Sequence, residues 1–427
     1  MTHARQTRLS PSRRAIAAWC TSLAWWIALG LLAAARPAVA AEWPHWRGPG
    51  FDGQAPDTAG LLAREPVALR VLWKRTLGVA YSGISIARGR AVTMSSDGKL
   101  DYVVALDAAT GATIWQHVLE TTVEPEDGSE GGAKSVPAID GDRVFALGPK
   151  GLLLALRLED GSEVWRLRID DELGAAEPPF GFATSPLVVG DVLIVQVGGG
   201  EGRSVVGLDK RTGKVVWSSG DDSAQYGSPI PGQLAGVEQV VSVTEHLVSG
   251  VDAATGKIHW SSKPKAGGVP TAVLLGDDRL LITGADRSVA YRVRRAESGF
   301  AVDELWTTRD LKNLEHNFAT PVFHQGYVYG YSGSFLTCVS ASDGKVAWKS
   351  RPPGGFGLIL VDGRLVILDK DGGVVVVDAA PAGYREVTRV EVFDRTSYAY
   401  PSFADGKIFV RNTKEIAAVG IAPGAVP

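Results

Sequence analysis

Cysteine is almost absent from this chain of 427 residues, which contains only Cys20 and Cys338. Cys20 lies inside an apolar segment near the amino terminus that we expect to be removed, so the mature chain has one thiol and no intramolecular disulfide. No Cys-x-x-Cys-His sequence is present, which excludes covalent attachment of a c-type haem. Because Cys338 lies in a strand pattern, Leu336 to Val339, we interpret it as a small buried hydrophobic residue.

The usual local signatures of enzyme chemistry are also missing. The histidines are scattered, without the spacing of a metal site. The glycine-rich run Gly198 to Gly202 predicts a hairpin turn and not a phosphate loop, because no helix pattern follows it. The acidic stretch Glu124 to Glu130 lacks the Asp/Asn alternation of a calcium loop, so we interpret it as a solvated loop. We therefore assign no catalytic residue and no metal ligand.

Basic runs interleaved with aromatic residues are absent as well. The longest apolar run, Ala15 to Ala35, follows four arginines and precedes Ala38-Val39-Ala40, which is the pattern of a cleaved secretory signal. We predict a signal peptide over residues 1–41, with a retained membrane anchor as the alternative. Cleavage removes five arginines and no acids, so the formal net charge falls from −3 to about −8. Neither nucleic acid nor an anionic membrane is then expected as a partner, and no transmembrane span remains.

One sequence motif is repeated through the rest of the chain. Its clearest copy, Val104 to Trp115, reads VALDAATGATIW: a strand, a polar turn and a second strand that ends on tryptophan. Asp107 and Gly111 have the turn chemistry of a β-hairpin, a local acceptor followed by a residue that tolerates positive φ. Related copies end at Trp165, Trp217, Trp260, Trp306, Trp348 and Phe393, and an isolated strand carries Trp73. Their period of roughly 45 residues is that of a four-stranded propeller blade.

The repeated units begin with a similar sequence, and the first strand of the array completes the last unit. Each opens on an apolar strand after a small residue and often proline, at Pro137, Pro186, Pro229, Pro270, Pro321 and Pro401. Proline suits the start of an innermost, edge strand because it has no N–H to donate. The last unit, Ser397 to Ile421, has only three strands, and its missing outer strand is the isolated one at Val67 to Leu77.

We therefore predict an all-β fold. It is a single eight-bladed β-propeller of four-stranded antiparallel blades over residues 67–421, with the ring closed by N- and C-terminal strands in one blade. An irregular N-terminal arm, residues 42–66, precedes the ring, and a tail, residues 422–427, follows it. Leu305 to Asn317 is the only stretch in which a short helix is an alternative interpretation to a strand.

The repeated aromatic residues are expected to dock neighbouring blades against one another. Burying one tryptophan removes roughly 150–250 Å² from water, about 4–6 kcal/mol as an upper estimate. These docking positions are Trp73, Trp115, Trp165, Trp217, Trp260, Trp306, Trp348 and Phe393. The two tryptophans of the arm, Trp43 and Trp46, are expected to pack on the outside of the folded body, with a ligand-binding surface as the alternative.

A second set of residues is expected at the mouth of the axial channel. Three positions before five of the aligned openings stand Tyr81, Lys134, Tyr226, Phe318 and Tyr398, with His316 and Asn317 beside them. Such a ring would line a funnel for a planar or anionic ligand. The alternative is that these side chains only fill the channel.

The pattern Ala-x-Asp-x-x-Thr-Gly-x-x-x-Trp resembles the PQQ-like, or quinoprotein-type, propeller repeat over nearly the whole mature chain, Trp43 to Ile421. That family includes PQQ-dependent alcohol dehydrogenases and the non-enzymatic lipoprotein of the outer-membrane barrel-assembly machinery. The dehydrogenases typically carry adjacent, disulfide-bonded cysteines and Glu, Asn and Asp ligands for Ca²⁺, and this chain has no Cys-Cys pair. It also lacks the lipid-anchored cysteine that begins the mature lipoprotein.

The resemblance implies an exported, non-catalytic propeller that acts as a protein-binding or scaffold module of the cell envelope. We expect it to be soluble in the periplasm or secreted, monomeric, without a cofactor, and bound to envelope protein partners. One alternative is a PQQ-dependent oxidoreductase of the alcohol or sugar dehydrogenase type, which would hold PQQ with Ca²⁺ near Lys134 and the channel tyrosines. The other is a propeller that binds a small ligand or carbohydrate.

Overall fold

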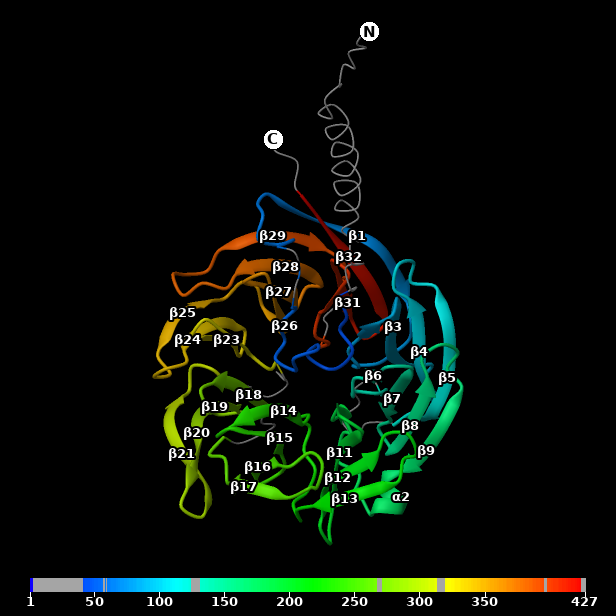
Figure 1. Cartoon of the computed structure of the whole chain (residues 1–427), viewed down its shortest axis with the longest axis vertical. Helices are drawn as coiled ribbons and strands as arrows, with labels where there is room; N and C mark the ends of the chain where they lie inside the picture. The colour runs from blue at the N-terminus through cyan, green and yellow to red at the C-terminus, as the bar shows by residue number, and fades with distance from the viewer. Residues whose placement is uncertain are drawn as a thin grey trace. The chain divides into compact units, whose positions relative to one another are not determined.

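The computed structural model describes residues 1–2, 41–56, 58, 60–123, 131–266, 271–312, 319–394 and 398–423. The compact unit Ala41–Pro427 is built almost entirely from strands. They form eight four-stranded antiparallel sheets arranged in a ring (Figure 1). The predicted eight-bladed β-propeller is confirmed.

Seven blades follow one another along the chain, each running from its innermost to its outermost strand. They are β2–β5 (Ser85–Ala87, Arg90–Ser96, Leu100–Asp107, Thr113–Thr121), β6–β9 (Ala138–Asp140, Arg143–Leu147, Leu152–Arg157, Glu163–Arg168), β10–β13 (Leu187–Val189, Val192–Gly199, Arg203–Asp209, Val215–Ser219), β14–β17 (Ile230–Leu234, Val237–Val243, Val248–Val251, Ile258–Ser262), β18–β21 (Thr271–Gly276, Arg279–Thr283, Ser288–Ala296, Gly299–Thr308), β22–β25 (Val322–His324, Tyr327–Ser332, Phe335–Ser340, Val346–Ser350) and β26–β29 (Gly355–Val361, Arg364–Asp369, Gly373–Asp378, Glu386–Glu391). Inner strands such as β6, β22 and β30 begin directly after the aligned prolines, as the missing proline N–H predicts.

The eighth blade joins the two ends of the ring. It contains β30 (Ser402–Ala404), β31 (Lys407–Arg411), β32 (Glu415–Pro423) and, outermost, β1 (Val67–Thr76). β1 pairs antiparallel with β32, with Leu69 opposite Ile421. The isolated tryptophan strand is therefore the missing outer strand, and this pairing gives β32 a neighbour on its outer side.

No helix occurs in the described part, 305–312, of the stretch Leu305 to Asn317 where a short helix is an alternative to a strand, and 313–317 lie outside the described residues. β21 continues as a strand to Thr308, because buried Trp306 and Thr308 alternate with exposed Leu305 and Thr307. A short helix, α2 (Ile169–Leu173), lies instead after β9, in the connection to β10.

Six of the seven outer-strand tryptophans donate a hydrogen bond to the hairpin turn of the following blade. Trp115 Nε1 donates to Leu158 O at 2.9 Å, and Trp217 Nε1 donates to Ala253 O at 3.0 Å. Trp73, Trp165, Trp306 and Trp348 make the same kind of bond. A Cβ on the turn residue Gly161 would lie 2.6 Å from Trp115 Cδ2, so the indole packs directly on glycine. The turn of one repeat thus covers the tryptophan of the repeat before it.

Trp260 departs from this rule for a local reason. The next blade has a long outer hairpin, β20–β21, whose turn lacks the Asp-x-x-Thr-Gly sequence. Trp260 Nε1 donates instead to Gln239 Oε1, 2.6 Å away on β15 of its own blade.

Gly213→Ala is expected to lower the free energy of unfolding by about 2–5 kcal/mol. Its Cβ would lie 2.8 Å from Trp165 Cε3, which adds overpacking of about 1–3 kcal/mol to the roughly 1–2 kcal/mol cost of positive φ. Gly190→Ala is the matched control, since Gly190 also has positive φ but nothing lies within 4 Å of its Cβ. Equal losses for the two variants in chemical denaturation would contradict the contact.

The N-terminal arm packs against the innermost strands, so the prediction that its tryptophans lie outside was wrong for Trp43. Trp43 is 2% exposed and forms a β-bridge with Ile86 of β2. Pro44 O accepts from Ile139 N of β6 at 2.7 Å, and Gly53 O accepts from Leu360 N of β26 at 2.8 Å. Figure 1 shows the arm crossing the centre of the ring. An innermost strand has a free edge toward the axis, and the arm satisfies part of that edge.

Candidate functional site

The residues predicted at the channel mouth fall into separate groups. Tyr81, Lys134 and Tyr398 lie together: the Tyr81 and Tyr398 ring centroids are 5.7 Å apart, and Lys134 Nζ is 5.5 Å from the Tyr81 centroid. Tyr226 lies beside Phe180, with centroids 6.1 Å apart, and its hydroxyl accepts from Phe180 N at 3.2 Å. The other three predicted residues, His316, Asn317 and Phe318, lie outside the described part of the chain.

Two aromatic residues at this end were missed by sequence reasoning. Phe356, at the start of β26, lies 4.8 Å from Tyr398 between ring centroids, and Phe180 partners Tyr226. Both follow a Pro-Pro pair, which is the only local signal, and neither stands three residues before an aligned proline. Phe180 and Tyr398 are 42% and 39% exposed. We call Tyr81, Phe180, Tyr226, Phe356 and Tyr398 the mouth aromatics.

The mouth aromatics lie at the starts of the inner strands, whereas the backbone pairs of the arm lie at their middle or toward their ends, and the side chain of Arg47 reaches the carbonyls just before β22. Phe356 stands at the start of β26, whereas Leu360, which pairs with the arm at Gly53, stands near its end. Tyr81 and Tyr398 likewise precede β2 and β30. The arm therefore packs along the middle and toward the ends of the inner strands, and the starts of these strands present aromatic side chains.

Two buried carboxylates, Asp101 and Glu120, lie close to one another, and Asp101 lies close enough to Lys134 to be affected by its charge. Asp101 on β4 is fully buried; its Oδ1 accepts from Thr122 Oγ1 at 2.9 Å, and burial raises its pKa, opposed by the charges of Lys134 and Lys150. Glu120 on β5 is 8% exposed and accepts from Lys150 N at 2.7 Å and from Arg168 Nη1 at 3.2 Å. Burial raises the pKa of Glu120 to about 7, with Asp101 adding to the effect.

Glu120 is expected to make stability depend on pH. Its pKa in the fold, about 7, lies above the ordinary 4.5, so the folded state binds this proton more tightly than the unfolded chain. The contribution is fully present below about pH 4.5 and is lost as the pH rises through 7, a loss on the order of 3 kcal/mol. Glu120→Gln should remove this loss, measured by denaturant titration as the difference in unfolding free energy between variant and wild type from pH 5 to 8.

Glu163→Gln is the control for that measurement. Arg166 lowers the pKa of Glu163, so its titration lies below the tested range and the slope should not change. A difference between wild type and Glu120→Gln that stays constant from pH 5 to 8 would contradict the assignment.

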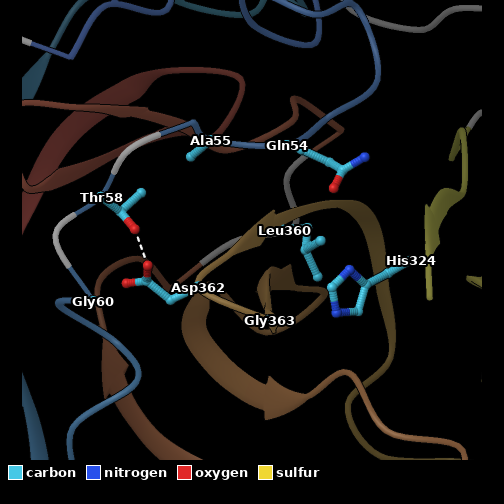
Figure 2. Close-up of a pocket in the computed structure, with 8 residues that line it drawn as sticks. All are labelled: Gln54, Ala55, Thr58, Gly60, His324, Leu360, Asp362 and Gly363. Carbon is cyan, nitrogen blue, oxygen red and sulfur yellow. Dashed lines mark hydrogen bonds between the residues drawn. The ribbon is translucent and has the colours of Figure 1, made fainter.

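A pocket of about 420 Å³ opens at the arm end of the inner strands. The arm and the turns that follow β22 and β26 form it, and its lining residues are Gln54, Ala55, Thr58, Gly60, His324, Leu360, Asp362 and Gly363 (Figure 2). Thr58 Oγ1 donates to Asp362 Oδ1, and Leu62 N donates to Asp362 Oδ2 at 2.8 Å. Burial lowers the pKa of His324, so its imidazole is neutral at pH 7.

Potential metal ligands gather at one place in the described part of the chain. Within the described part of the chain, a cluster of three potential metal ligands occurs at Asp222, Glu245 and His246, around the turn from β15 to β16. Asp222 there accepts hydrogen bonds from Thr244 Oγ1 and the backbone of His246 and Leu247. The Asp222 carboxylate, in the connection from β13 to β14 and four residues before Tyr226, thus holds that turn together.

Comparison with known protein families identifies the family of this chain. The family model described as outer membrane protein assembly factor BamB matches residues 99–242, 202–302 and 234–382. The chain belongs to this family. Its members carry the PQQ-like repeat, so the repeat pattern and the expected resemblance are confirmed.

Individual relatives are distant. BamB of Yersinia pestis is 26% identical over 312 residues, 71% of this chain and 63% of the relative. BamB of Escherichia coli K12 is 26% identical over 53% of this chain and 45% of its own length. Quinohemoprotein alcohol dehydrogenase ADH IIB of Pseudomonas putida is 28% identical over 36% of this chain and 24% of its own length. The chain thus spans less than two thirds of the length of these curated relatives.

Solved structures show the same fold. BamB from Moraxella catarrhalis superposes with a TM-score of 0.59 and 15% identity, covering 84% of this chain and all of that one. Quinohemoprotein alcohol dehydrogenase ADHIIG from Pseudomonas putida gives 0.60 and 12%, covering 90% and 81%. An enzyme and an assembly factor share the architecture, so the fold does not choose between them. In the described residues, we find no helix with the length and apolar character of a membrane span.

Proposed function

We propose that the chain is a non-catalytic, protein-binding propeller of the cell envelope that serves outer-membrane protein assembly. In this proposal residues 1–41 direct export, the propeller acts as a monomer in the periplasm, and no PQQ is bound. The observation that carries it is the group of mouth aromatics at the starts of the inner strands, of which Phe180 and Tyr398 are exposed and the other three are half-buried. Exposed aromatic side chains are the residue type that supplies binding energy in protein interfaces.

A genetic experiment tests this function. Deleting the gene in the source organism is expected to lower the outer-membrane protein content of the envelope severalfold. The wild-type gene should restore it, and a Phe180→Ala/Tyr398→Ala double variant should not. The matched control is Ile114→Ala/Val216→Ala, since these apolar residues are 42% and 52% exposed on outer strands away from the mouth. An unchanged outer membrane in the deletion strain contradicts the proposal.

The oxidoreductase alternative is favoured by one finding, the similarity to ADH IIB. It is tested by titrating the purified protein with PQQ and Ca²⁺ while following tryptophan fluorescence. Saturable binding that Lys134→Ala abolishes would support the enzyme. The binding-module proposal predicts no saturation at high micromolar PQQ.

A further inference from the structure

We propose that the pocket between the arm and the turns after β22 and β26 binds a small primary ammonium compound, with the Asp362 carboxylate as its counter-charge. The pocket lies at the other ends of the inner strands from the mouth aromatics. The inference therefore goes beyond the proposed function and does not depend on it.

The carboxylate of Asp362 is held in one orientation before any ligand arrives. Thr58 Oγ1 donates to one carboxylate oxygen, and Leu62 N donates to the other at 2.8 Å. The Asp362–Gly363 turn has positive φ at both residues, 53° and 72°, as two-residue hairpin turns require. Each carboxylate oxygen has a further acceptor position, so the fixed group keeps capacity for an N–H donor.

The charge of the residues that line the pocket indicates which class of ligand it would bind. The residues that line the pocket include one carboxylate and no lysine or arginine. Among the residues that the structure describes, Asp362 forms no ion pair, and the nearby Arg364 is engaged by Glu65 and Asp378. A partly enclosed negative charge without a protein cation favours a cationic ligand, and a charge-assisted N–H···O bond is the strong way to bind it.

The other polar groups suit an ammonium that carries hydroxyl groups. Figure 2 shows Gln54 and His324 on one side of the pocket and Thr58 and Asp362 on the other. Gln54 Nε2 donates to Asp52 Oδ2 at 3.0 Å, which orients the amide. Because burial keeps the His324 imidazole neutral, it does not repel a cation and offers one donor and one acceptor.

Size limits the ligand to roughly that of a monosaccharide. A volume of about 420 Å³ falls at the low end of the usual range for small-molecule sites. Glucosamine is therefore a suitable probe, and glucose is its matched neutral control, because the two differ in a single amino group.

Isothermal titration calorimetry of the whole protein with both sugars tests the proposal. Wild-type protein is expected to bind glucosamine at least tenfold more tightly than glucose at pH 7. Asp362→Asn keeps the size of the side chain and removes the charge, so its affinity for glucosamine should fall at least tenfold. Asp405→Asn is the matched control: Asp405 occupies the same turn position between β30 and β31, with φ of 49°, and does not line the pocket.

Three results would overturn the proposal: no saturable glucosamine binding up to about 20 mM, equal affinity for the two sugars, or equal affinity in wild type and Asp362→Asn. The first two need only wild-type protein, so the test holds even if the variant is unstable. None of the three results bears on outer-membrane protein content, so failure here and failure of the proposed function are distinguishable.

Discussion

Trp43→Ala is expected to lower the free energy of unfolding by about 4 kcal/mol. Trp43 is 2% exposed, and truncation of a buried tryptophan costs roughly 3–5 kcal/mol because the cavity cannot close fully. The indole also packs on Gly48, where a Cβ would lie 2.8 Å from Trp43 Cε3, so the arm has folded closely around it. Chemical denaturation of the protein without residues 1–41 measures the change.

The second arm tryptophan provides the comparison. Trp46 is only partly buried, beside the core formed by β14–β21, so Trp46→Ala should cost clearly less. A loss below about 1 kcal/mol for Trp43→Ala would show that the arm is not packed against the inner strands.

Trp217→Ala is expected to destabilise the ring by about 3–4 kcal/mol, and Trp217→Phe by less. Trp217 is 8% exposed and packs on Gly256 of the next blade, and its Nε1 donates to Ala253 O at 3.0 Å. Alanine removes both the buried area and the bond, whereas phenylalanine keeps most of the area and loses a bond worth about 1 kcal/mol. If urea unfolding gives the same loss of unfolding free energy for Trp217→Ala and Trp217→Phe, the indole contributes little by packing between blades.

The sequence predicted the blades well because their determinants are local. Turn residues such as Asp107 and Gly111, the prolines before inner strands and the period-two burial of outer strands each act within a few residues. The closing pair β1 and β32 was predictable because an unpaired outer strand at one end matched a three-stranded unit at the other.

Contacts between distant segments were not predictable in the same way. Arg47 is 2% exposed and donates to Thr320 O and Pro321 O at 3.0 and 2.8 Å, although arginine is normally exposed and no pattern marks its burial. The contact of each turn glycine with the preceding repeat's tryptophan also needs the ring to be assembled. Of the mouth residues, the repeat alignment predicts Tyr81, Lys134 and Tyr398 at equivalent positions, whereas Phe356 lies inside β26 and not three residues before an opening.

Site-specific photo-crosslinking in the envelope tests the central claim most directly. A photoreactive amino acid replaces Tyr398, 39% exposed among the mouth aromatics, and in a second strain Val216, 52% exposed on outer strand β13. Binding through the mouth predicts a crosslink to a protein of the outer-membrane assembly machinery from position 398, which the Phe180→Ala background weakens, and no such product from position 216. The same product from both positions, or from position 216 alone, would contradict it.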